Sequence, residues 1–83
     1  MEMLEYKKAV KEILGEVIMY EDYDDSQDLI KEGILDSLTI VYLISRLEEE
    51  FNIAIDEKLI APKNFSSINT IADFLDSLEK DGS

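Results

Sequence analysis

The chain has 83 residues, 46% of them hydrophobic, which suffices for one small core in a single domain over residues 1–83. Twenty acidic side chains against eight basic ones give a net charge of −12, which argues against nucleic acid and anionic membranes as partners. Without cysteine or histidine, disulfides, thiolate metal sites and Ser-His-Asp or Cys-His catalysis are excluded. We therefore expect neither an enzyme nor a metal site.

The first residues, 1–5, lack the basic and apolar regions of a signal peptide, and the longest apolar run is only a few residues. A cytoplasmic protein without a membrane span is therefore expected. The acidity favours partners with basic docking patches, met at salt-sensitive rates. An alternative is that the charge only keeps a small protein in solution.

The first predicted helix covers residues 3–19. Its apolar residues recur at helical spacing, at Tyr6, Val10, Ile13, Leu14 and Val17. A long polar passage follows over 20–28, in which neither the helical nor the strand period persists. Beyond it, Leu29 and Ile30 are expected to attach this loop to the core. Gly33 supplies backbone freedom before the next helix.

The second predicted helix covers residues 37–51 and carries two apolar stripes. The expected core face consists of Ile40, Ile44, Leu47 and Phe51, with Leu43 beside it. The second stripe consists of Leu38, Val41, Tyr42 and Ser45. The core does not account for the second stripe. The alternation in 51–55 is at most a weak strand signal, because a lone strand has no partner.

A short helix or loop is expected over 56–65, interrupted by Pro62, with Leu59, Ile60 and Phe65 entering the core. Ser67 or Asn69 then caps a last helix over 68–80. Its apolar stripe is Ile68, Ile71, Phe74, Leu75 and Leu78. The sequence therefore predicts an all-α four-helix bundle with a long first loop and a short third helix.

Asp36-Ser37 stands at the head of the second helix. Taken alone, the dipeptide is most simply a helix start, because aspartate and serine both cap free backbone N–H groups. Its surroundings change this interpretation: Gly33-Ile34-Leu35-Asp36-Ser37-Leu38 heads an apolar helix that closes with Glu48-Glu49-Glu50-Phe51. A serine there has no histidine to activate it, so we interpret it as a residue that another enzyme modifies.

This pattern resembles the acyl carrier protein family, which includes peptidyl and D-alanyl carrier proteins, over roughly residues 29–78. The resemblance implies an acyl-carrier-protein-like bundle in which Ser37 is esterified with 4′-phosphopantetheine from coenzyme A. The chain would then be a phosphoprotein of biosynthesis that carries an acyl or aminoacyl group as a thioester. An anion on Ser37 would face the positive end of the helix, and Asp36 would cap the helix and present Ser37.

The resemblance also implies a docking surface for partner enzymes on the second helix. Its residues here are Leu38, Val41, Tyr42, Ser45, Glu48 and Glu49. Two alternatives stay open. Leu38 and Val41 could fold against the first loop, and residues 48–50 could be a solvated helix end with weak ion pairs.

The implied partners are a phosphopantetheinyl transferase, an adenylating ligase or acyltransferase, and downstream condensing or transfer enzymes, all met by a monomer. Carriers of fatty acid synthesis have acidic residues where this chain has Thr39 and Tyr42, and a small residue in place of Arg46. The chain therefore looks more like stand-alone carriers loaded by adenylating ligases, as D-alanyl and aminoacyl carriers are.

Two rival interpretations remain. The first is an acidic helical adaptor or inhibitor that binds a basic partner surface without modification. The second is a carrier domain cut from a megasynthase, against which Met1 and the lack of linker sequence argue.

The acidic first loop was compared with the calcium-binding EF-hand pattern. From Asp22 the required glycine position is Gln27, and from Asp24 it is Leu29, so both registers fail. A weak divalent site among Asp22, Asp24, Asp25 and Asp28 stays open as an alternative.

Overall fold

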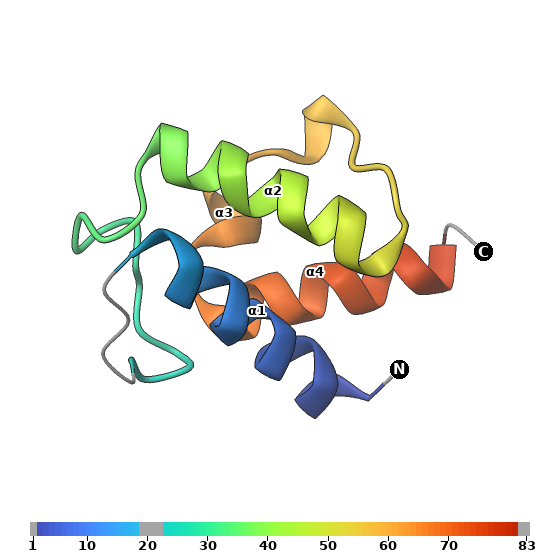
Figure 1. The fold of residues 1–83 in the computed structure, drawn as a ribbon, viewed down its shortest axis with the longest axis horizontal. Coiled ribbons are helices and arrows are strands. Elements are labelled where there is room, and N and C mark those ends of the chain that lie inside the picture. The colour runs from blue at the N-terminus through green and yellow to red at the C-terminus, as the bar shows by residue number, and fades with distance from the viewer. Residues whose placement is uncertain (1, 19–22, 82–83) are drawn as a thin grey trace.

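The structure, a computed structural model, describes residues 2–18 and 23–81. Its elements are α1 (Met3–Val17), α2 (Ser37–Phe51), a 3₁₀ turn η1 (Glu57–Leu59), α3 (Pro62–Phe65) and α4 (Ile68–Asp81), arranged as Figure 1 shows. No strand occurs in the described ranges. The all-α bundle with a long first loop and a short third helix is confirmed. The first helix ends at Val17, because Ile18 is extended, and Met19 lies outside the described residues.

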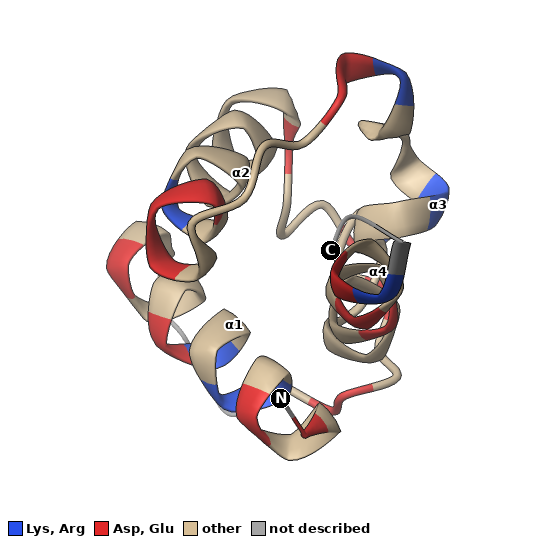
Figure 2. Cartoon of the chain, turned by 90° about the vertical axis from the view of Figure 1, so that its right-hand side faces the viewer, with Lys and Arg blue, Asp and Glu red and all other residues tan. Residues whose placement is uncertain are grey.

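The helices surround one apolar core. α1 packs on both α2 and α4, and the short α3 packs on α4. Seen nearly along α4 in Figure 2, α1 and α2 lie on one side of the molecule and α3 and α4 on the other, with acidic residues on all three long helices. The buried helical side chains are Tyr6, Val10, Ile13, Leu14, Leu43, Ile44, Leu47, Phe65, Ile68, Ile71, Ala72, Phe74 and Leu75. Burial of these side chains is the main favourable contribution to folding.

Two aromatic pairs join different helices. The rings of Phe65 and Phe74 meet edge to face with centroids 5.2 Å apart, which fixes α3 on α4. The rings of Tyr6 and Phe51 lie 5.5 Å apart and join the start of α1 to the end of α2. Burial of the hydroxyl raises the pKa of Tyr6.

The core face of α2 is turned slightly from the expected one. Leu43, expected beside the face, is completely buried, whereas Ile40 and Phe51 are only partly buried. The face therefore centres on Leu43, Ile44 and Leu47. A helix with apolar residues on two stripes fits either orientation by its period alone, and packing against α1 decides between them.

The prediction that Leu59 and Ile60 enter the core is wrong, because they are 37% and 38% exposed. Ile55 is buried before them and Phe65 after them, so the chain is attached to the core at both ends of this segment. Pro62 begins α3, a position that suits its fixed φ, and directs Phe65 inward. The segment between them, η1, stands out from the bundle (Figure 1).

The described part of the first loop, 23–36, is fastened to the core at several points. Leu29 is completely buried, its N–H donates to the Ser66 carbonyl (2.7 Å), and its carbonyl accepts the N–H groups of Ile34 and Leu35. Gly33 has φ +76°, which favours glycine and confirms the expected need for backbone freedom. The loop therefore delivers the chain to the start of α2 at a fixed place.

Candidate functional site

The start of α2 is held by Asp36, the expected cap. Its Oδ1 accepts hydrogen bonds from the backbone N–H (2.9 Å) and the hydroxyl (2.8 Å) of Thr39. These bonds stabilise the ionised carboxylate and so lower the pKa of Asp36. A negative charge at this end also complements the helix dipole. The carboxylate is thus turned toward Thr39 and serves the helix.

Ser37, the first residue of α2, is exposed. Unlike the neighbouring polar side chains, the Ser37 hydroxyl makes no side-chain hydrogen bond to any of the described residues. It stands at the end of a 15-residue helix, where free backbone N–H groups and the positive end of the dipole favour an anion. The arrangement can accept a phosphate ester on Ser37 without repacking of the core.

Exposed apolar side chains lie near the start of α2, and we call them the apolar rim: Leu38, Val41 and Tyr42 of α2, with Ile60, which lines one cleft with Ser37 and Val41, and its exposed neighbour Leu59. Leu38 is 82% exposed and Val41 62%. The alternative that these two fold against the first loop is therefore wrong. Among the described residues, only Leu4 is a large exposed hydrophobic side chain away from this surface.

A cleft of about 230 Å³ opens directly beside Ser37. Its lining residues are Ser37, Ile40, Val41, Ile60, Ala61 and Pro62. The stretch 60–62 therefore contributes to the site, which the sequence reasoning missed. The available signal was an apolar run without helical period ending at a proline.

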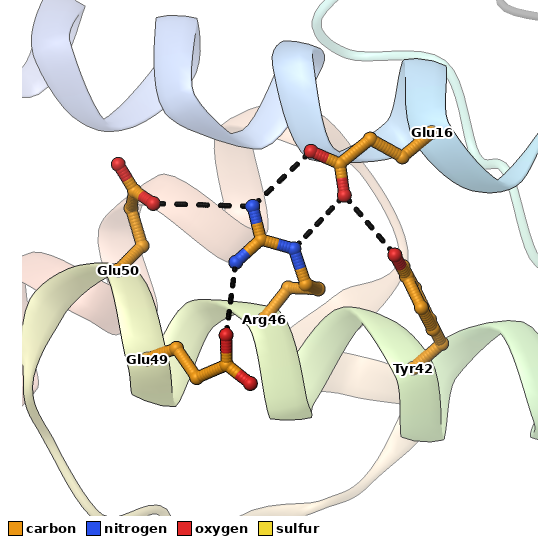
Figure 3. A network of polar contacts seen from close by, with 5 residues as sticks. All are labelled: Glu16, Tyr42, Arg46, Glu49 and Glu50. Atoms are coloured by element: carbon orange, nitrogen blue, oxygen red, sulfur yellow. Dashed lines mark hydrogen bonds and ion pairs between the residues drawn. The ribbon is translucent and has the colours of Figure 1, made fainter.

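A polar network joins α2 to α1 (Figure 3). Arg46 donates to both carboxylate oxygens of Glu16, from Nε to Oε1 (2.9 Å) and from Nη2 to Oε2 (3.1 Å). The Tyr42 hydroxyl donates to Glu16 Oε1 at 3.1 Å. Arg46 also pairs with Glu49 (3.4 Å) and Glu50 (3.9 Å) of its own helix. The Arg46 guanidinium is the largest cause of a lowered pKa of Glu16.

The six docking residues expected on α2 fall into two groups. Leu38, Val41, Tyr42 and Ser45 are exposed along the helix from Ser37. Glu49 is exposed but paired with Arg46, and Glu48 is half-buried and accepts the Ile55 N–H at 2.8 Å. With a rise of about 1.5 Å per residue, Glu49 lies about 18 Å along the helix from Ser37. The geometry therefore places Leu38, Val41 and Tyr42 nearest Ser37, with Ser45 and then the two glutamates farther along the helix.

The carboxylates of the acidic loop are engaged separately. Asp24 accepts from the backbone and hydroxyl of Ser26, Asp25 pairs with Lys11 (3.0 Å) and Lys7 (3.6 Å), and Asp28 accepts the Lys31 N–H. Within residues 2–18 and 23–81 no three acidic side chains are grouped as a metal site, and Asp22 lies outside these ranges.

None of the helices in the same ranges is long and apolar enough to cross a membrane.

Comparison with known proteins identifies a family and similar solved structures. The family model described as "Phosphopantetheine attachment site" matches residues 8–75. The chain is also similar to one in a solved structure described as "Crystal structure of FAD-dependent dehydrogenase", with 30% identity and a TM-score of 0.67. That match covers 86% of this chain and 99% of the other. No curated protein sequence matches the chain.

Proposed function

The chain belongs to the phosphopantetheine attachment-site family, whose members carry 4′-phosphopantetheine covalently, and on this premise we propose that Ser37 is the attachment residue. The proposal is supported by one observation above the others. Ser37 is the exposed first residue of a long helix, with its neighbour Asp36 committed to the cap. A transferase can reach the hydroxyl there, and the phosphodiester would lie at the positive end of α2.

In the proposed modification, the Ser37 hydroxyl oxygen forms a bond to the phosphorus of the pantetheine phosphate of coenzyme A. The bond from that phosphorus to 3′,5′-ADP breaks, and the hydroxyl proton passes to a base of the transferase, since the chain has no histidine. When bound, the group supplies a thiol on a flexible arm, which this cysteine-free chain lacks. The helix end fixes where the arm begins, and the free backbone N–H groups stabilise the phosphate.

We further propose that residues 1–83 act as a single monomeric carrier domain in the cytoplasm and not as an enzyme. The partners would be a phosphopantetheinyl transferase, an adenylating ligase or acyltransferase, and downstream condensing or transfer enzymes. The contact would be made by the apolar rim, with Ser45, Glu48 and Glu49 toward its far end. Leu59 and Ile60 extend the surface expected on α2 alone.

An acyl or aminoacyl group loaded by an adenylating ligase is the cargo we favour. The surface of α2 nearest Ser37 is apolar. Of the three glutamates at the other end of this helix, Glu49 and Glu50 are paired with Arg46. Such a surface suits a partner that docks by apolar contact more than one that docks by a basic patch. The similarity to a chain in the FAD-dependent dehydrogenase structure adds enzymes of that class to the downstream partners to test.

The test is incubation of the folded protein with coenzyme A and a broad-specificity phosphopantetheinyl transferase, followed by intact-mass measurement and peptide mapping. We expect one phosphopantetheinyl group on Ser37 and none on Ser37→Ala. Ser77→Ala, which removes an exposed serine of α4, is the matched control and should be modified like wild type. An unmodified wild-type protein would contradict the proposal and favour the unmodified adaptor.

A further inference from the structure

Glu16, near the end of α1, touches the apolar rim although it is distant from it in sequence. Its Oε1 accepts the hydroxyl of Tyr42 at 3.1 Å, and the same carboxylate receives two hydrogen bonds from Arg46 (Figure 3). Two residues of α2, one turn apart, thus share one carboxylate from another helix. The contact therefore connects the apolar rim to α1, in addition to the core contacts that already pack the two helices together.

The geometry restricts how the Glu16 carboxylate lies. Two parallel N–H···O bonds from a planar guanidinium define one orientation of a carboxylate, unlike a single contact to a lysine. The Arg46 side chain is 24% exposed and that of Glu16 42%, so the hydrogen bonds, and not burial, hold the Glu16 carboxylate in place. The Tyr42 hydroxyl donates to this carboxylate, which restricts the positions open to the ring.

Tyr42 lies within reach of any enzyme that acts on Ser37. A specific interface covers about 800 Å² on each partner, which corresponds to a disc of about 16 Å radius. At about 1.5 Å per residue, Tyr42 is about 7.5 Å along α2 from Ser37 and Arg46 about 13.5 Å. At about 3.6 residues per turn, Tyr42 is also turned about 140° around the helix axis from Ser37, one turn beyond the exposed Leu38 on the same stripe. An interface that covers Ser37 and Leu38 therefore reaches the Tyr42 ring toward its edge.

We propose that Glu16 is a positioning residue for enzyme docking: held by Arg46, it fixes the half-exposed Tyr42 ring so that a phosphopantetheinyl transferase meets a preformed apolar surface beside Ser37. The inference rests on the function proposed above. Ordering a side chain before binding removes part of the entropy cost of association, which improves affinity and leaves the chemical step unchanged. If the network only held α1 and α2 together, its loss would change the stability of the fold instead of the affinity for the transferase.

The test measures initial rates of phosphopantetheinylation against carrier concentration, with coenzyme A and a broad-specificity transferase. Glu16→Ala should raise KM by about three- to tenfold with kcat unchanged, the range expected for one released side chain. Glu16→Gln keeps one oxygen acceptor but loses the paired hydrogen bonds from Arg46, so its KM should lie between those of wild type and Glu16→Ala. Tyr42→Phe should resemble Glu16→Ala, and the double variant should be no worse than either single one.

Ser67→Ala is the control for general destabilisation, because Ser67 caps α4 away from the apolar rim. It should lower the melting temperature and leave KM at the wild-type value. Wild-type KM in Glu16→Ala, independent losses that multiply in the double variant, or an equal rise of KM in Ser67→Ala would each overturn the inference. Absence of modification in the wild type would instead defeat the proposed function, so the two failures are distinguishable.

Discussion

The helices α2 and α4 begin in the same way. The side chain of the residue before each helix accepts a hydrogen bond from the N–H of a threonine three residues later. Asp36 accepts the N–H and the hydroxyl of Thr39, at 2.9 and 2.8 Å. Ser67 Oγ accepts the Thr70 N–H at 3.1 Å and lies 2.8 Å from the Thr70 hydroxyl oxygen. By local geometry the two starts are nearly equivalent.

Their surroundings are opposite. At α4, Ser67 is 6% exposed and Ile68 is completely buried, and the Asn69 N–H donates to the Asp25 carbonyl of the first loop. At α2, Ser37 is exposed and Leu38 is 82% exposed. The comparison teaches that a capping pattern identifies a helix start, whereas a modification site also requires that the first turn face outward.

The largest expected difference lies in the first apolar residue of each helix. Ile68→Ala should lower the free energy of unfolding by about 2–5 kcal/mol, because it leaves a cavity in the core. Leu38→Ala should change it by no more than about 0.5 kcal/mol. Urea denaturation followed by circular dichroism measures both, with Ile68→Val, at about 0.5–1.5 kcal/mol, as the milder variant. Equal losses at Ile68 and Leu38 would break the comparison.

Removal of each cap should have a smaller effect, of similar kind at both starts. Ser67→Ala should lower the free energy of unfolding by about 0.5–2 kcal/mol, the range typical of caps. Asp36→Ala should also lower the melting temperature, and Asp36→Asn should recover most of it because asparagine is an equally good cap. Thermal melts of the three variants decide this. A neutral Asp36→Ala would mean that Asp36 only faces the partner.

The two caps should differ in their response to pH. The pKa of Asp36 is lowered in the folded protein, so its stabilising effect is complete above the ordinary aspartate pKa of about 4 and is lost as pH falls through the lower folded value. The gap in melting temperature between wild type and Asp36→Ala should therefore close on acidification. The gap between wild type and Ser67→Ala should stay nearly constant, since serine does not titrate.

The smallest expected effect concerns Asp25, whose carbonyl receives the first turn of α4 and whose carboxylate pairs with Lys7 and Lys11. Asp25→Asn should cost at most about 1 kcal/mol, because exposed ion pairs contribute little. Added NaCl should shrink this loss and also raise the wild-type melting temperature, by screening the repulsion of a chain with net charge −12. A loss that persists at high salt would indicate that the carboxylate supports the loop by another contact.

Much of the fold was predictable because its signals are local. The bounds of α2 agree with the expected 37–51, since Asp36 caps its start and Asn52, with φ +53°, follows its end in the left-handed region. The α4 stripe is buried nearly as expected, with Leu78 only partly so. An amphipathic period identifies a buried stripe wherever a helix has a single apolar face.

Features that depend on contacts between distant segments were not predictable. Leu59 and Ile60 show no helical or strand period that would predict their orientation. They are exposed because the chain is attached to the core on either side of them, at the buried Ile55 and Phe65. Glu16 and Arg46 are thirty residues apart. With twenty acidic and eight basic side chains in the sequence, their spacing does not indicate that these two form a pair. Such pairs form only when two helices are brought into register by the core.

The sequence by itself determined the three long helices, the cap of α2 and the family, because capping residues, apolar periods and a serine motif act over a few residues. Only the tertiary structure decided which of the two similar helix starts faces outward. It also decided that residues 60–62, which follow η1, lie beside Ser37, and that Glu16 reaches Tyr42. The physical reason is that exposure is set by what packs above a residue, and that depends on the whole chain.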